Sequence, residues 1–193
     1  MLNYLEFFKI CGKLKNVKRT GWIRSGVELP ESVSDHMYRM SMFAFSLDKD
    51  VLVGVKDQQP IDKIKCMKMS LVHDLGESLV GDFTPDDKIT KAEKYQLEKN
   101  AMIEITSHLN KEVATEIFNL WQEYEDAQSN EALLVKDFDK FEMVLQAVEY
   151  ESKQPHLNLQ SFFDSTRGKF TYPLFQKLAE KLEKDRIEKI QSK

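Results

Sequence analysis

Hydrophobic residues recur at spacings of three and four along most of the chain, which is typical of amphipathic helices. The pattern predicts helices over about 2–15, 32–47, 62–74, 90–108, 112–124, 131–151 and from 173 onward. In the first helix, Leu2, Leu5, Phe8 and Leu14 fall near one stripe. The segments 16–30 and 160–171 interrupt the pattern and are predicted to be loops. The sequence therefore predicts a single all-α domain with about six main helices and a C-terminal helix.

Composition supports a helical fold. The 193 residues include only 7 Gly and 5 Pro, and the chain has no Asn-Gly or Asp-Gly pair that would favour a hairpin turn. Helix-start signals precede several of the predicted helices. Ser32 or Ser34, Asp62, and Ser129 or Asn130 are candidate N-caps, and Thr90 with Glu93 forms a capping-box pattern.

Two histidines and an aspartate interrupt the apolar faces. His36 lies beside Val33 and Met40 on the stripe of the second predicted helix. A lone histidine there is more often a core residue that is satisfied by a hydrogen bond. The stripe of the third helix is Ile64, Met67 and Leu71. His73 and Asp74 follow it, and Asp74 takes its next apolar position. A carboxylate on a buried face is costly unless it is paired, hydrogen-bonded or bound to a metal.

The sixth predicted helix carries another acidic group on its apolar face. Asp137 lies three residues after Leu134 and four before Phe141, so helical geometry places it inside. Asp139 is expected to point elsewhere and to be solvated. Together, His36, His73, Asp74 and Asp137 make a nitrogen and oxygen donor set for Mn²⁺, Co²⁺, Fe²⁺, Zn²⁺ or, less readily, Mg²⁺.

Charge and cysteine usage limit the possible partners. The formal net charge of −4 gives no general attraction to nucleic-acid polymers or to anionic membranes. Cys11 and Cys66 match no zinc or disulfide pattern and indicate a reducing compartment. The N-terminus does not resemble a signal peptide, and no apolar run approaches transmembrane length. We therefore expect a soluble cytoplasmic protein.

The ordered set of motifs resembles the HD-domain metal-dependent phosphohydrolases, and most of all their 5′-deoxynucleotidase branch, the YfbR-like and HD-domain-containing-protein-2-like group. The resemblance covers nearly the whole chain. Its most specific segment is Pro30-Glu31-Ser32-Val33-Ser34-Asp35-His36, followed by Leu71-Val72-His73-Asp74 and by Val135-Lys136-Asp137. Arg19-Thr20-Gly21-Trp22 and the stretch from Glu77 to Gly81-Asp82 also match.

The resemblance implies a function and roles for particular residues. His36, His73, Asp74 and Asp137 would hold the metal, and Glu77 would be the catalytic carboxylate. Glu77 and Asp82 would alternatively help to hold a second metal. The reaction would be hydrolysis of 2′-deoxyribonucleoside 5′-monophosphates to deoxynucleoside and phosphate. Related members also suggest a homodimer.

Three further residues would contact the substrate. Arg19 would bind the phosphate, Trp22 would line the sugar pocket and reject a ribose 2′-hydroxyl, and Asp82 would take part in substrate binding. In the bacterial branch the arginine and tryptophan are neighbours, whereas Thr20 and Gly21 separate them here, which bears on deoxy-selectivity. From the residues alone, the basic loop that carries Trp22 is equally well interpreted as a solvated loop whose indole packs onto the core.

The implied domain has a core over about 30–152, an N-terminal helix and substrate loop over 1–29, and a C-terminal helix over about 172–191. Two alternatives stay open: a non-catalytic helical module that binds a nucleotide or a protein, and a less selective phosphomonoesterase. A di-iron oxygenase, which shares the fold of the family that the chain resembles, is disfavoured. The oxygenase requires extra histidines between His73 and the last aspartate, and only His108 lies there. His108 and His156 are expected to be surface or packing residues.

Overall fold

The computed structural model describes residues 3–84 and 86–191, and it confirms the all-α fold. The helices are α1 (Tyr4–Lys13), α2 (Thr20–Arg24), α3 (Val33–Ser46), α4 (Lys63–Val72), α5 (Glu77–Val80), α6 (Lys91–Thr106), α7 (Lys111–Asp126), α8 (Asn130–Lys153), α9 (Gln160–Thr166) and α10 (Pro173–Gln191). The seven longest correspond to the predicted helices. The short helices α2 and α9 lie in segments that were predicted to be loops.

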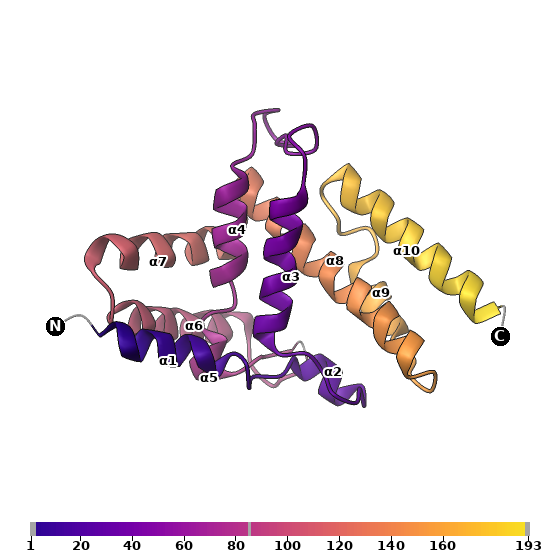
Figure 1. Ribbon diagram of the computed structural model, residues 1–193, viewed down its shortest axis with the longest axis horizontal. Coiled ribbons are helices and arrows are strands. Elements are labelled where there is room, and N and C mark those ends of the chain that lie inside the picture. Colours follow the sequence, from indigo (N-terminus) through magenta and orange to yellow (C-terminus); the bar gives the residue numbers. More distant parts are fainter. Residues whose placement is uncertain (1–2, 85, 192–193) are drawn as a thin grey trace.

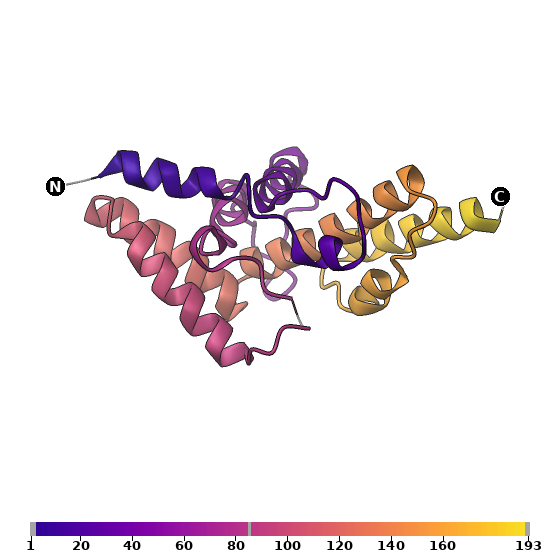
Figure 2. The same cartoon turned by 90° about the horizontal axis from the view of Figure 1, so that it is seen from below.

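The helices form a bundle around α3, α4 and α8. Helices α3 and α4 run side by side, and the long α8 passes behind both (Figure 1). On one side α10 packs along α8, and on the other α1, α6 and α7 form a second group (Figures 1 and 2). None of the described helices is both long and apolar enough to span a membrane.

Local capping signals fix where most helices begin. Ser32 accepts the backbone N–H of Asp35, and the Asp35 carboxylate accepts the backbone N–H of Ser32 in return. Thr90 and Glu93 form the same reciprocal box at the start of α6. Asp62 and Ser129 cap α4 and α8. These side chains satisfy backbone donors that have no partner within the helix, so the predicted starts are confirmed.

Two apolar clusters meet on α3. The larger one contains Met40 and Ala44 of α3 with Phe138 of α8. The smaller one contains Val33 and Met37 of α3 with residues of α1, α6 and α7. His36 lies between these two sets along the same buried face, so the fold places its imidazole where the two halves of the core join.

The predicted apolar stripe of α1 is confirmed at Leu14, which is buried, but is wrong at Leu5 and Phe8. These two side chains are 66% and 64% exposed, and Ile10 is buried instead. Leu2, the first residue of the predicted stripe, lies outside the described residues. The inner face of α1 is the one that packs against α5 and α6, and spacing alone did not distinguish it from the outer face.

The predicted face of α4 is wrong at two of its three residues, and only Met67 packs against the core. Ile64 and Leu71 are more than half exposed, and Cys66, Met69 and Val72 are buried instead. Helix α4 ends at Val72, and residues 73–76 form turns before α5. Asp74 therefore reaches the interior because the chain turns after α4, and not because it continues an apolar helical stripe.

Candidate metal centre

Two imidazoles on different elements present a free nitrogen to the same interior space. His36 lies on α3 and His73 caps the end of α4, and both are buried, with their ring centroids 5.5 Å apart. The Nδ1 atoms lie 2.6 Å from Glu142 Oε2 and 3.0 Å from the Ser70 carbonyl oxygen, respectively. Because both of these partners are acceptors, each ring in its neutral form carries its proton on Nδ1 and leaves Nε2 as a lone-pair donor to a metal.

Neither Nε2 atom has a hydrogen-bond partner among the described residues, although both are buried. An unpaired buried polar atom is costly and calls for an explanation. Two such atoms that face nearby carboxylates are well suited to bind a divalent cation. The residues present therefore fit the metal that the sequence predicted.

Two carboxylates lie next to these nitrogens. Asp74 Oδ2 is 3.1 Å from His73 Nε2 and 3.9 Å from His36 Nε2. Asp139 Oδ1 is 3.2 Å from His36 Nε2. Ligand atoms of His36, His73 and Asp74 all lie within 4.8 Å of one another, close enough to share one ion.

The structure corrects the prediction for Asp137. Its side chain is buried, as predicted, but its carboxylate accepts backbone N–H groups of Thr171 at 2.8 Å and Tyr172 at 2.7 Å. Lys140 Nζ lies 3.0 Å from its other oxygen. Asp137 therefore joins α8 to the segment before α10, and Asp139 takes the position beside His36. Asp139 is not the solvated residue that was expected, because its side chain is only 32% exposed.

Arg19 lies between the two carboxylates of the cluster. Its Nη1 is 3.4 Å from Asp74 Oδ2, and its Nη2 is 3.9 Å from Asp139 Oδ1. The Arg19 side chain is mostly buried, and the residue is the N-cap of α2. A planar, permanently charged fork at this place suits a phosphate group that bridges to the cluster.

Glu77 begins α5 and is buried, and its Oε2 has no hydrogen-bond partner among the described residues. Burial raises the pKa of Glu77 well above its usual value, and the nearby carboxylates of Asp74 and Asp82 raise it further. Asp82 accepts the backbone N–H of Thr20 at 2.5 Å. Asp82 thereby links the loop after α5 to the helix that follows Arg19.

Trp22 is packed into the core. It is 1% exposed, and its ring stacks on Phe162 with centroids 4.3 Å apart and meets Tyr150 edge-on. The indole Nε1 donates to Glu31 Oε1 at 2.8 Å. The indole therefore packs onto the core, as one of the two interpretations of this loop predicted. Any contact with a sugar would involve only a small edge of the ring.

Several groups around the cluster were missed by the sequence reasoning. Tyr124 donates to Asp139 Oδ2 at 2.8 Å, and its ring lies against His73 with centroids 4.8 Å apart. Glu142 accepts from His36 Nδ1, and Arg39 donates to the other oxygen of Glu142. The signal was spacing, because Glu142 lies one helical turn after Asp139 and Arg39 one turn after His36. That signal has meaning only once Asp139 is known to face the cluster.

The cluster attracts positive charge. Burial and Arg19 lower the pKa of His36, but Glu142 and Asp139 more than offset this and raise it to about 9. For Asp74, burial raises the pKa, yet His73 and Arg19 hold it well below its usual value. Burial likewise raises the pKa of Asp139, and His36 and Arg19 lower it well below its usual value. Both carboxylates beside the histidines are therefore ionised near neutral pH, as metal ligands must be.

The other two histidines do not join the cluster. The carbonyl of His108 accepts the backbone N–H of Asn3 at the turn between α6 and α7, and His156 is exposed after α8. Arg24, which belongs to the predicted basic loop, is also engaged elsewhere. Its Nη2 lies 2.6 Å from Asp87 Oδ1. Asp87 belongs to the acidic loop between α5 and α6, which also carries Asp82 and Asp86. Of the basic residues near Trp22, Arg19 is the one that faces the cluster.

Comparison with known proteins identifies related sequences over almost the whole chain. A family model described as HD domain matches residues 11–179. A Dictyostelium discoideum protein named 5′-deoxynucleotidase HDDC2 is 72% identical over 96% of this chain and 100% of its own length. The Homo sapiens protein of the same name is 44% identical over 94% of this chain and 85% of its own length.

A solved structure from Pyrococcus horikoshii has the same fold. It superposes with a TM-score of 0.73 at 31% identity, covering 93% of this chain and 96% of that one. The arrangement of helices that brings α3, the end of α4 and α8 together is thus shared with an archaeal protein.

Proposed function

The chain belongs to the HD-domain family, and we propose that it is a metal-dependent 5′-deoxynucleotidase that hydrolyses 2′-deoxyribonucleoside 5′-monophosphates to deoxynucleoside and phosphate. The names of its relatives support the reaction: proteins called 5′-deoxynucleotidase are 72% and 44% identical to it over nearly its full length. We infer that the whole chain acts as a single catalytic domain.

One observation carries this proposal. Two buried imidazole Nε2 atoms without hydrogen bonds face two carboxylates, and a guanidinium lies between those carboxylates. The nitrogens and carboxylates suit a divalent cation, and the guanidinium suits a phosphate beside it. The same cluster thus provides for both the metal and the anionic group of the substrate.

We assign the metal to His36, His73, Asp74 and Asp139. When bound, a divalent cation lowers the pKa of a coordinated water and polarises a phosphoryl oxygen. The residue types accept Mn²⁺, Co²⁺, Fe²⁺, Zn²⁺ or Mg²⁺. Asp139 replaces Asp137 in this assignment because Asp139 is the carboxylate of α8 that lies beside His36.

The remaining site residues act on the phosphate and on protons. Arg19 binds two phosphate oxygens and orients the ester. Glu77 has a buried, unpaired oxygen and a raised pKa, which suits a carboxyl group that gives a proton to the leaving 5′-oxygen. Asp82 holds α2 against the loop after α5. If a second metal binds, Glu77 and Asp82 are its candidate ligands.

We assign deoxy-selectivity to the wall of the sugar pocket that is formed by Trp22 and the aromatic rings packed on it. Trp22 lies in α2, three residues after the N-cap Arg19, so one short helix positions both side chains. Glu31 accepts the indole N–H and therefore fixes the ring. A pocket shaped by these rigid groups would exclude a ribose 2′-hydroxyl by lack of space.

Phosphate release from 5′-dAMP, dGMP, dTMP, AMP and 3′-AMP tests the function. Each substrate is assayed with Mn²⁺, Co²⁺, Mg²⁺ or chelator, on the wild type and on Asp74→Ala and Glu77→Gln. We expect metal-dependent release from the 5′-deoxy substrates, loss of metal and activity in Asp74→Ala, and lower turnover with retained metal in Glu77→Gln. Activity on AMP as well would support a less selective phosphomonoesterase.

A non-catalytic binding module would bind these nucleotides without releasing phosphate, and that result would overturn the proposal. Full activity of Glu77→Gln would overturn the role of Glu77 alone. Metal analysis of the purified protein gives the number of bound ions, and a second equivalent that is lost in Asp82→Asn would place the second ion at Glu77 and Asp82.

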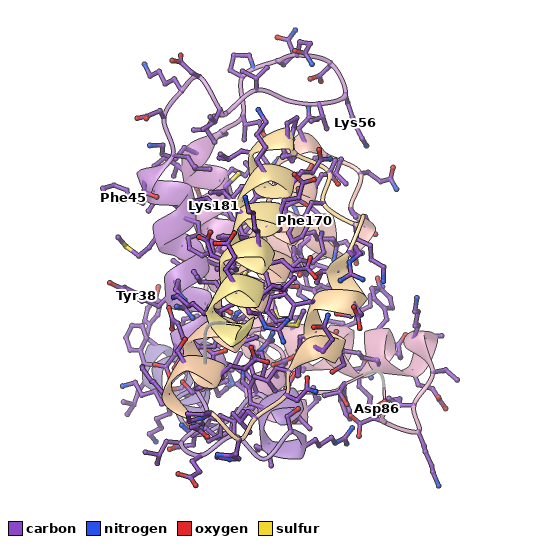
Figure 3. The ribbon with its side chains drawn as sticks, turned by 90° about the vertical axis from the view of Figure 1, so that its right-hand side faces the viewer. Tyr38, Phe45, Lys56, Asp86, Phe170 and Lys181 are labelled. Atoms are coloured by element: carbon purple, nitrogen blue, oxygen red, sulfur yellow. The ribbon has the colours of Figure 1, made fainter. Side chains whose placement is uncertain are left out.

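We also propose a cytoplasmic homodimer. The outer face of α3 exposes Tyr38, Met42 and Phe45, which are 66%, 42% and 59% exposed and lie on one helical stripe. Figure 3 shows Tyr38 and Phe45 projecting outward from the same edge of α3. Light scattering on the wild type should give twice the chain mass, and Phe45→Glu should give the monomer mass if this face forms the interface.

A further inference from the structure

The two imidazoles of the cluster are held by different acceptors. His36 Nδ1 lies 2.6 Å from Glu142 Oε2, and both side chains are completely buried. Arg39 Nε donates to the other oxygen of Glu142 at 2.8 Å. We propose that Glu142 is a positioning residue that fixes the metal-binding tautomer of His36 and thereby sets the affinity of the centre, and that Arg39 fixes Glu142. The inference rests on the proposed role of His36 as a metal ligand.

The contacts of Glu142 are those of a hydrogen-bond network. Atoms of Glu31, His36 and Glu142 lie close enough to hold a second ion. However, 2.6 Å is a charge-assisted hydrogen bond between Nδ1 and the carboxylate, and the other Glu142 oxygen already accepts from a guanidinium. The carboxylate of Glu31 accepts from the Trp22 indole. A cation placed here would have to displace these donors and approach Arg39.

The comparison with His73 shows what Glu142 adds. His73 Nδ1 lies 3.0 Å from a backbone carbonyl, which is a neutral acceptor. Both contacts keep the proton on Nδ1, but a carboxylate attracts it more strongly and makes the opposite nitrogen a better donor to a metal. His36 is therefore the more basic of the two nitrogen ligands, and Glu142 is the cause.

Arg39 holds the carboxylate in place. It lies one turn after His36 on α3 and contacts successive turns of α8. Its nitrogens donate to Glu142 and Glu149, each at 2.8 Å, and to Gln146. This fork fixes how α3 lies against α8, which also places His36 beside Asp139. One side chain thus aligns both the ligand and its supporting carboxylate.

Glu142→Gln tests the tautomer directly. Arg39 Nε–H requires an acceptor, so the oxygen of the introduced amide should face Arg39 and its N–H₂ group should face His36. A donor at that place forces the imidazole proton onto Nε2, which blocks the nitrogen that binds the metal. We expect the Kd for Co²⁺, measured by competition with a chromogenic chelator on metal-free protein, to rise about 10- to 100-fold. Nitrogen-15 NMR of the metal-free imidazoles, recorded at about pH 10 where His36 is neutral in the wild type, should show His36 changing from Nδ1–H to Nε2–H.

Matched variants separate this role from simple packing. Glu149→Gln removes a partner of the same Arg39, but Glu149 has a 41% exposed side chain and does not contact His36. Its Kd for Co²⁺ should stay within about twofold of the wild type, as for a surface ion pair. Glu142→Asp retains the negative charge and should recover part of the affinity. Arg39→Lys leaves Glu142 without its fork and should weaken Co²⁺ binding less than Glu142→Gln does.

Two outcomes would overturn the inference while leaving the proposed activity intact. One is a Glu142→Gln protein that keeps the wild-type Kd and the Nδ1–H tautomer. The other is an equal loss of affinity in Glu142→Gln and Glu149→Gln. If Glu142→Gln does not fold, Arg39→Lys decides, and an unchanged Kd in that variant counts against the proposal. A wild type that binds no Co²⁺ would reject the metal centre and the inference together.

Discussion

Asp137 and Asp139 lie two residues apart on α8 and serve different parts of the molecule. The Asp137 carboxylate accepts backbone N–H groups of Thr171 and Tyr172, whereas Asp139 Oδ1 lies 3.2 Å from His36 Nε2. Two residues of an α-helix differ by about 200° in direction, so the two side chains leave opposite sides of α8. One of them anchors the C-terminal segment and the other faces the metal cluster.

The pair predicts opposite phenotypes for two similar substitutions. Asp139→Asn should lose most of the bound metal and the phosphate release. Asp137→Asn should keep the metal but lower the free energy of unfolding by about 1–3 kcal/mol, because buried donors lose a charged acceptor. Metal analysis and urea unfolding measure the two effects. Loss of metal in Asp137→Asn with a normal fold would contradict this assignment.

Arg19→Lys should lower kcat/KM for 5′-dAMP by about tenfold or more, because lysine cannot donate two parallel hydrogen bonds to a phosphate. Steady-state kinetics at saturating Mn²⁺ measure the effect. Arg24→Lys is the matched control, since Arg24 contacts Asp87 in the acidic loop and not the cluster. It should stay close to wild type, as expected for a partly exposed ion pair. Equal losses in the two variants would contradict a specific phosphate contact by Arg19.

Glu98 predicts a pH dependence of stability. Burial raises its pKa to about 7, although Lys94, whose Nζ lies 3.3 Å away, opposes the shift. In the unfolded chain the pKa is near 4.3. Between these values the folded state binds the extra proton, so the stability of metal-free protein falls as pH rises through this window. Glu98→Gln should reduce that fall and be more stable than wild type at pH 8, by on the order of 2 kcal/mol.

Urea unfolding in the presence of chelator at pH 5 and pH 8 measures the effect, and Glu93→Gln in the same helix is the control. The Thr90 side chain and backbone lower the pKa of Glu93. Its contribution is present above the unfolded pKa and is lost as pH falls, which is the opposite sign. If Glu98→Gln and wild type lost the same stability between pH 5 and pH 8, the buried carboxyl group would not be the cause.

A substitution at Gly21 tests whether the packing of Phe162 on Trp22 affects substrate selectivity. A Cβ at Gly21 would lie 3.3 Å from Phe162 Cε1, and Phe162 stacks on the Trp22 ring. Gly12 is also helical and has open space around the added Cβ, so Gly12→Ala should stabilise the protein by about 0.5–1 kcal/mol. Gly21→Ala should gain less and should change the ratio of kcat/KM for dAMP over AMP. Equal stabilities and unchanged ratios in both variants would remove Trp22 from the selectivity argument.

The sequence by itself determined the seven longer helices and most of their starts, because capping is a local interaction. Ser32, Asp62 and Thr90 satisfy donors only two or three residues away, and these are visible without any knowledge of packing. The three polar groups His36, His73 and Asp74 were also found from the sequence. His36 stands out because buried faces rarely carry such a side chain, whereas Asp74 was found although the stripe assigned to its helix is largely exposed.

Only the tertiary structure decided which faces and which carboxylates serve the centre. Leu5 and Leu71 lie on outer faces because the neighbouring helices pack elsewhere. Helix α8 is buried on several sides, so its periodicity placed Asp137 inside but did not reveal what lies opposite it. Residues 171–172 lie opposite Asp137, and α3 lies on the other side of α8. Both are distant from α8 residues 137–139 in sequence. The choice of Asp139, and the support of His36 by Glu142, follow from contacts between helices that no local pattern encodes.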